Sequence, residues 1–228
     1  MSLHLIAMHG WAGDQRGWQP FAEAATARGW QWNSGERGYG DLPPAMPGWR
    51  ARARRVLVVH SLGLHLLPPA LLAEAEAVVL LASFARFVPE GGAGRRLRTA
   101  LAGMEQALGG AGAAAMLQRF YARAADPVAV DPASPGIGDR PLPAEGRRRL
   151  LSDLRLLGGT RGLPEGFPTG ARLLIVEAGR DRIVLPEARR LLRQALPAAD
   201  RLHLAGAGHC LLDTGLPAML DGWLSQLA

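Results

Sequence analysis

A short apolar run that ends at a tight turn constrains the fold of this chain more than any other feature. Residues 56–59 read Val-Leu-Val-Val, and His60-Ser61-Leu62-Gly63 follows them directly. An apolar, β-branched run bounded by a turn predicts a strand that is buried on both faces. Strands of this kind belong to parallel sheets that helices cover on both sides, so the run favours an α/β fold.

Strand and helix signals alternate along most of the remaining sequence. Further apolar runs predict strands at 3–8, 30–33, 78–82, 173–178 and 201–204. Helical patterns lie at 21–28, 62–73, 186–196 and 217–227, the second with a break expected at Pro68-Pro69. Strands that alternate with helices predict a mostly parallel sheet with helices on both of its faces.

The stretch from 84 to 168 differs, because it contains no strand signal. Helix-prone runs of Ala, Leu and Arg alternate there with Gly and Pro. It holds twelve arginines against eight acidic residues, and so carries most of the chain's net charge of +6. We therefore expect an α/β core formed by 1–83 and 169–228, with 84–168 inserted between the two parts as a helical segment.

Composition limits the class of protein further. A chain of 228 residues can form one sizeable core, and its 48% apolar and 20% charged residues are a globular balance. No apolar run reaches the roughly 18 residues of a membrane helix, and the N-terminus lacks the pattern of a secretory signal. The single cysteine, Cys210, cannot form an internal disulfide. We therefore expect a cytoplasmic, monomeric protein with no membrane partner.

Ser61 is the first candidate for a catalytic nucleophile, because a serine on a sharp turn after a buried strand is the layout of a nucleophile elbow. The usual pattern is Gly-x-Ser-x-Gly, and Val59 stands here in place of the first glycine. A serine hydroxyl needs a base, and the base needs an acid to orient it. Asp181 follows the predicted strand 173–178, and His209 follows the strand 201–204. We expect these two side chains to meet Ser61 at one edge of the sheet.

The chain resembles the α/β-hydrolase superfamily in five fragments that occur in that family's order: His9-Gly10-Trp11, Arg37-Gly38-Tyr39-Gly40, His60-Ser61-Leu62-Gly63, Gly179-Arg180-Asp181 and Gly208-His209. The resemblance implies a triad of Ser61, His209 and Asp181. It also implies an oxyanion hole formed by the backbone N–H groups of Trp11 and Leu62, and a helical lid over the site at 84–168. With no paired His or Cys at ligand spacing, we expect neither a metal nor a cofactor.

At a finer level, the His-Gly-Trp loop, the small size and the arginine-bearing insertion resemble the pimeloyl-acyl-carrier-protein methyl ester esterases of biotin synthesis. This implies hydrolysis of a methyl ester at the far end of an acyl chain, with an acyl-carrier protein as partner. The candidate contacts to substrate or carrier are Arg119, Phe120, Arg123, Arg149 and Arg155. The guanidinium group of arginine binds phosphates and carboxylates through paired hydrogen bonds. The alternative is that such clusters simply form the solvent-exposed face of a helix.

Two other functions fit the same residues. One is an esterase or thioesterase for small free esters. The other is a non-catalytic binding protein built on a hydrolase scaffold, for which the Val59 departure is the only support in the sequence. All 26 basic residues are arginine, but no nucleic-acid motif accompanies them and they are not interleaved with exposed aromatic residues, so a nucleic-acid partner is not expected.

Overall fold

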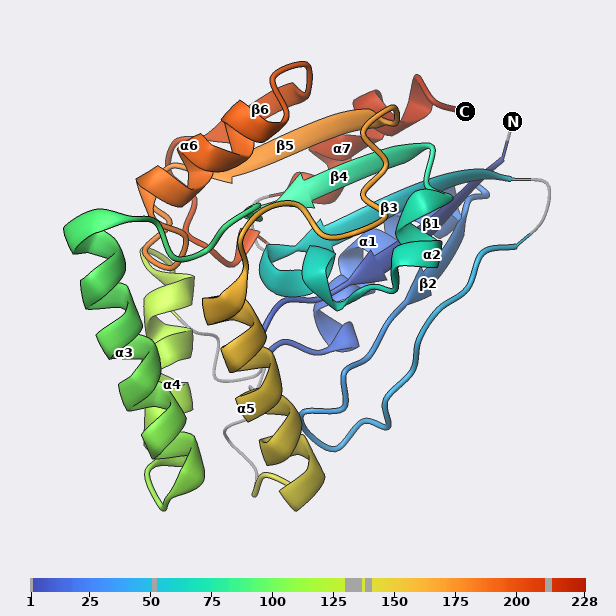
Figure 1. Cartoon of the computed structure of the whole chain (residues 1–228). Helices are drawn as coiled ribbons and strands as arrows, with labels where there is room; N and C mark the ends of the chain where they lie inside the picture. Colours follow the sequence, from blue (N-terminus) through green and yellow to red (C-terminus); the bar gives the residue numbers. More distant parts are fainter. Residues whose placement is uncertain (1, 51–52, 130–136, 138–140, 212–214) are drawn as a thin grey trace.

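A six-stranded parallel sheet forms the centre of the computed structural model, which describes residues 2–50, 53–129, 137, 141–211 and 215–228. The strands lie in the order β2-β1-β3-β4-β5-β6 (Figure 1). Their bounds are β1 Leu3–Met8, β2 Gln31–Ser34, β3 Arg54–His60, β4 Ala77–Leu81, β5 Arg172–Ala178 and β6 Asp200–Leu204. The expectation of a mostly parallel sheet is confirmed.

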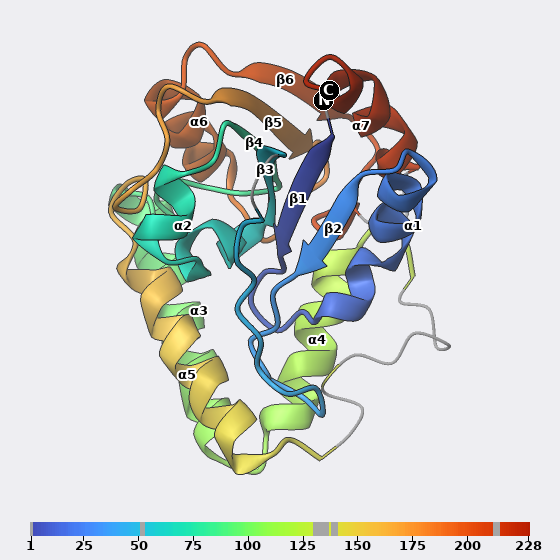
Figure 2. The same cartoon turned by 90° about the vertical axis from the view of Figure 1, so that its right-hand side faces the viewer.

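Helices cover both faces of this sheet. Figure 2 shows α1 (Gln19–Ala27) and α7 (Leu216–Ser225) on one face, and α2 (Pro69–Ala73) and α6 (Pro186–Ala195) on the other. Side chains of a strand point alternately to opposite faces, and β3 follows this rule: Val56 and Val58 enter one buried cluster, Leu57 and Val59 the other. Burial on both faces is the physical reason why β3 reads as a continuous apolar run rather than an alternating one.

A third group of helices lies beyond the carboxyl ends of the strands, as Figure 2 shows. It consists of α3 (Gly91–Gly109), α4 (Ala113–Ala125) and α5 (Ala144–Gly159), and α3 packs against both of the others. All three fall in the stretch where the sequence predicts helices and no strand. Within the described ranges, no helix combines the length and apolar character needed to cross a membrane.

The segment after β3 differs in detail from the expected helix at 62–73. It forms a six-residue 3₁₀ helix, η2 (Ser61–Leu66), followed by the five-residue α2. The break lies where it was expected, because Leu67 and Pro68 are both extended, with ψ angles of 144° and 143°. A proline disfavours helical backbone in the residue before it, so Pro68 holds Leu67 out of the helix and η2 ends at Leu66. A second 3₁₀ helix, η1 (Gln15–Trp18), precedes α1 and was not predicted.

Candidate active site

Ser61 is the first residue of η2 and follows β3 directly, at a turn where its backbone φ angle is +52°. This left-handed conformation is uncommon for a residue with a side chain, and it is found preferentially at functional sites. The residue is 96% buried from bulk solvent, yet it lines a large cavity. The turn thus has the strained geometry of a nucleophile elbow.

Two glycines allow the chain to pack closely around this turn. A methyl group added at Gly63 would lie 2.3 Å from the carbonyl oxygen of Met8 in β1, far inside van der Waals contact. One added at Gly10 would lie 2.9 Å from Cβ of Ser61. The segment 9–13, called the glycine loop below, therefore lies directly against the Ser61 turn.

Val59 does not prevent the turn from forming. Its side chain is fully buried, in the same cluster as Leu62 and Leu64 of η2. The segment that packs on this face is a short 3₁₀ helix that ends before Pro68, rather than a long α-helix. The place of the missing glycine is thus filled by apolar packing, while Ser61 keeps its left-handed conformation.

The predicted acid and base are brought together. Oδ2 of Asp181, in the loop after β5, lies 2.9 Å from Nδ1 of His209, in the loop after β6, and both side chains are buried. Oδ1 of Asp181 accepts the N–H groups of Ile183 at 2.7 Å and Val184 at 2.9 Å. Burial alone would raise the pKa of Asp181, but His209 and these hydrogen bonds outweigh it and bring the pKa below its ordinary value. Asp181 is therefore ionised at neutral pH and orients the imidazole.

His60 joins the Ser61 turn to the His209 loop. Its Nε2–H donates to the backbone carbonyl of His209 at 2.9 Å, and the two rings lie 4.8 Å apart. Burial, together with the neighbouring His209, lowers the pKa of His60 to about 3, so the ring is neutral at physiological pH. On the other side of the turn, the Ser83 hydroxyl donates to the Ser61 carbonyl at 2.8 Å. Both residues brace the turn.

Among the described residues, no hydrogen bond joins the Ser61 hydroxyl to the His209 ring. Contacts of this kind are often long in unliganded sites and tighten when substrate binds. Since Nδ1 of His209 is engaged by Asp181, Nε2 is the nitrogen that would exchange a proton with the serine.

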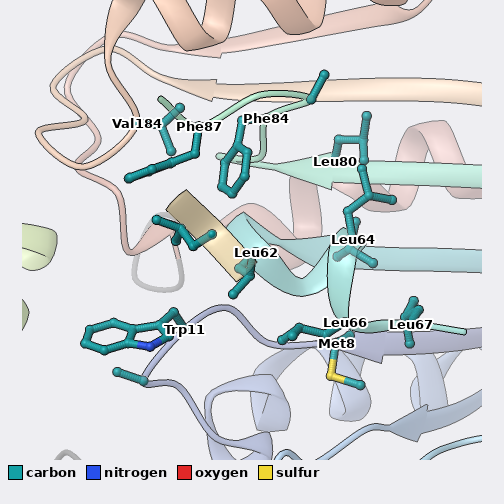
Figure 3. Close-up of a cluster of buried hydrophobic side chains, with 14 of the residues drawn as sticks. Met8, Trp11, Leu62, Leu64, Leu66, Leu67, Leu80, Phe84, Phe87 and Val184 are labelled. Carbon is teal, nitrogen blue, oxygen red and sulfur yellow. The ribbon is translucent and has the colours of Figure 1, made fainter. Parts of the chain in front are cut away.

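The predicted oxyanion residues flank the turn. Leu62 follows Ser61 and its side chain is fully buried, and Figure 3 shows it with Trp11 and Phe87 in one apolar cluster. The Trp11 indole donates to the carbonyl of Leu150 in α5 at 2.9 Å and packs edge-on against Phe120 of α4 at 4.9 Å. Its side chain is therefore held by the helices beyond the sheet.

A cavity of about 970 Å³ opens beside Ser61 and Trp11. Its walls are mostly apolar and come from α3, α4, α5, the loop after β4 and the loop after Asp181. They include Phe87, Leu97, Leu101, Met104, Met116, Phe120, Leu154, Leu157 and Ile183. Pockets of this size accommodate drug-sized ligands and acyl chains. Leu108 of α3 and Leu117 and Tyr121 of α4 lie outside this lining.

The arginines named from the sequence separate into two groups. Arg119 and Arg123 line the cavity with Phe120. Arg149 and Arg155 do not: Arg149 pairs with Glu145 at 3.2 Å and donates to the Gly38 carbonyl, whereas Arg155 pairs with Glu105 of α3.

The lining also contains two arginines that are not among the candidate contacts named from the sequence, Arg96 of α3 and Arg182. Arg182 directly follows the predicted acid Asp181, and that neighbour relation is the signal that could have identified it. Within the part of the chain that the structure describes, no cluster of three or more His, Cys, Asp or Glu side chains could hold a metal ion.

The sheet, its order and the turn after β3 define the class: the chain has the α/β-hydrolase fold. Its structure is similar to that of the enol-lactonase from Burkholderia xenovorans, with a TM-score of 0.71 and 16% identity over 100% of this chain and 92% of the other. It is similar to an esterase from Exiguobacterium antarcticum, with a TM-score of 0.73 and 13% identity over 99% and 91%. No family model matches the sequence, and no curated protein matches it significantly.

A third similar structure is MenH from S. aureus, with a TM-score of 0.60 and 14% identity over 98% of this chain and 94% of that one. At such low identities, these similarities establish the fold. They do not establish a reaction, which has to be inferred from the side chains of this protein.

Proposed function

We propose that this protein is a serine carboxylesterase that works through an acyl-enzyme. The observation that carries the proposal is the buried Asp181–His209 pair, 2.9 Å apart, in the loops after β5 and β6. Ser61 stands on its strained turn at the end of β3, on the same edge of the sheet, and lines the cavity. Nucleophile, acid and base follow one another in the chain order of α/β-hydrolases.

The reaction would proceed in two steps. In the first, Ser61 Oγ attacks the ester carbonyl while His209 Nε2 takes its proton, and the N–H groups of Trp11 and Leu62 stabilise the oxyanion. Collapse of this intermediate breaks the ester bond, and His209 returns the proton to the leaving alcohol. In the second step, His209 activates water, which releases the acid and restores Ser61. Ionised Asp181 stabilises the imidazolium each time.

For the substrate, we propose the methyl ester of a pimeloyl chain on an acyl-carrier protein, in the cytoplasm. The apolar cavity walls suit the chain of such a substrate, and the exposed Arg96, Arg119, Arg123 and Arg182 along the lining suit its anionic carrier and phosphopantetheine arm. Arg149 and Arg155 lie outside the cavity lining and are left out of this proposal. An esterase or thioesterase for small free esters is the second candidate, because the same site would accept them without a carrier.

Hydrolysis of a matched panel separates the two substrates: pimeloyl-acyl-carrier-protein methyl ester, free dimethyl pimelate and a short neutral ester. The carrier-bound ester should have the highest kcat/KM. That advantage should shrink as the salt concentration rises from about 0.1 M to 1 M, because the screening length falls from about 10 Å to 3 Å. Equal kcat/KM values with no salt dependence would favour the small-ester enzyme, and no hydrolysis of any ester would refute both.

A further inference from the structure

A buried carboxylate on α5 has no part in the reaction proposed above. Asp153 is 97% buried, and it accepts two hydrogen bonds from Arg37, from Nε and Nη2, both at 2.8 Å. The hydroxyl of the fully buried Tyr39 donates to it at 2.6 Å. Burying an ion pair is costly unless its remaining hydrogen bonds are satisfied. The Asp153 carboxylate meets this condition, because it accepts three hydrogen bonds. The arrangement joins α5 to the loop after β2.

The loop after β2 is joined in turn to the glycine loop, residues 9–13. The N–H of Arg37 donates to Nε2 of His9 at 3.2 Å, and Nδ1–H of His9 donates to the carbonyl of Gly10 at 2.9 Å. The buried Glu36 accepts the N–H of Gly38 at 2.7 Å and lies 3.5 Å from the His9 ring. A continuous set of hydrogen bonds therefore runs from Asp153 to the residue before Trp11.

The pKa directions agree with this network. Burial, and next the charge of Asp153, raise the pKa of Tyr39 well above its ordinary value, so its hydroxyl stays a donor. Burial would raise the pKa of Glu36, but His9 and the N–H groups of Gln15 and Gly38 bring it below its ordinary value, so the carboxylate stays charged.

Two further contacts tie the glycine loop to the same group of helices. The Trp11 indole donates to Leu150 of α5 at 2.9 Å, and the Tyr121 hydroxyl of α4 donates to the carbonyl of Ala12 at 2.7 Å. A methyl group added at Gly146 of α5 would lie 2.0 Å from the Tyr39 carbonyl, so helix and loop are in backbone contact. The glycine loop is thus held from outside the sheet by α4 and α5.

We propose that Asp153 is a positioning residue, which acts through Arg37 and Tyr39 to fix the glycine loop and hence the N–H of Trp11. The proposal rests on the proposed function in one respect: the Trp11 N–H matters to rate only if it stabilises an oxyanion. α4 and α5 then serve as the outer wall of the oxyanion site as well as the wall of the cavity. A misplacement of about 1 Å in a catalytic group can cost on the order of 100-fold in rate.

Asp153→Asn tests this, because it keeps the shape and removes the charge opposite Arg37. We expect kcat for a short neutral ester to fall by about 10- to 100-fold with KM nearly unchanged, the pattern of an interaction made in the transition state. Tyr39→Phe, which removes one hydrogen bond and no charge, should give a smaller loss in the same direction. The matched control is Glu105→Gln, which breaks the exposed Arg155–Glu105 pair between α3 and α5 and should leave kcat unchanged.

Hydrogen exchange of the same variants supplies a readout that does not depend on activity. Amides of 9–13 should exchange faster in Asp153→Asn than in the wild type, while those of β5 should not, and Glu105→Gln should change neither. All variants are compared at one temperature, which lies well below the Tm of the least stable of them. If Asp153→Asn keeps both the wild-type kcat and the wild-type exchange at 9–13, or if only KM rises, the positioning role is overturned. An inactive wild type whose loop still loosens in the variant would refute the proposed function and leave the loop's dependence on Asp153 standing.

Discussion

Gly63 and Ser61 show how single residues set the geometry of the site. Ser61 is held in a left-handed conformation, and the next glycine is the point where the turn passes closest to β1. The sequence made the turn predictable, because the apolar run and the following Ser-Leu-Gly are adjacent in the chain. It could not show how Val59 is accommodated, since that depends on what packs against the side chain.

Gly63→Ala should destabilise the fold, because its methyl group would meet the Met8 carbonyl oxygen at 2.3 Å, and backbone cannot move aside cheaply. We expect a loss of about 1–3 kcal/mol in the free energy of unfolding, with loss of esterase activity, measured by urea denaturation and ester hydrolysis. Gly103→Ala in α3 is the control: nothing lies within 4 Å of the added methyl group, and stability should rise by up to about 1 kcal/mol. Equal stability of the two variants would contradict the close contact at Gly63.

The lowered pKa of His60 determines the direction in which the stability of the fold changes with pH. This pKa is lowered from 6.5 to about 3 in the folded protein. Between these two pH values, the ring is therefore protonated in the unfolded chain and neutral in the folded protein. The contribution of the neutral His60 ring to the free energy of unfolding is fully present above about pH 6.5 and is lost as the pH falls toward 3. Relative to His60→Gln, the wild type should lose about 1 kcal/mol of unfolding free energy per pH unit between pH 6 and 4. Parallel stability curves for the two proteins would show that His60 titrates normally.

Among the elements, α3, α4 and α5 were predictable as helices but not in their orientation. Arg119 lines the cavity, whereas Arg155 of α5 pairs with Glu105 of α3. The elements that pack against a helix decide which of its faces turns inward. The sequence of an arginine-rich helix does not indicate which elements those are. The four inner strands, β1, β3, β4 and β5, were more predictable, because apolar runs buried on both faces leave little freedom. The 3₁₀ geometry of η2 was not predictable, because the apolar pattern of so short a segment does not distinguish a 3₁₀ helix from an α-helix.

Two arginines of α3 provide a matched pair for the role of the cavity lining. Arg96 lines the cavity and Arg98, two residues further along the same exposed helix, does not. Arg96→Gln should lower kcat/KM for the carrier-bound ester by about 2- to 5-fold, the effect of one solvent-exposed charge, and leave a short neutral ester unaffected. Arg98→Gln should change neither. If both variants lower kcat/KM for the carrier-bound ester equally, the helix contributes general charge rather than a specific contact.

At the scale of the whole molecule, the parallel sheet explains why distant parts of the sequence meet. Ser61, Asp181 and His209 follow β3, β5 and β6, whose carboxyl ends share one edge of the sheet. That edge was predictable from strand order along the chain and from the rule that sites of α/β proteins lie there. The network from Asp153 to the glycine loop was not, since it joins residues more than 100 positions apart that carry no shared pattern.

The central claim, that Ser61 is a nucleophile activated by His209 and Asp181, is tested most directly by a serine-reactive fluorophosphonate probe. Mass spectrometry should find one adduct on the wild type, at Ser61, and none on Ser61→Ala. Ester hydrolysis should fall by roughly 10⁴-fold or more in that variant. Hydrolysis at the wild-type rate in Ser61→Ala, or an adduct on a different residue, would contradict the mechanism. A folded wild type that neither reacts with the probe nor cleaves any ester would indicate a binding protein on a hydrolase scaffold.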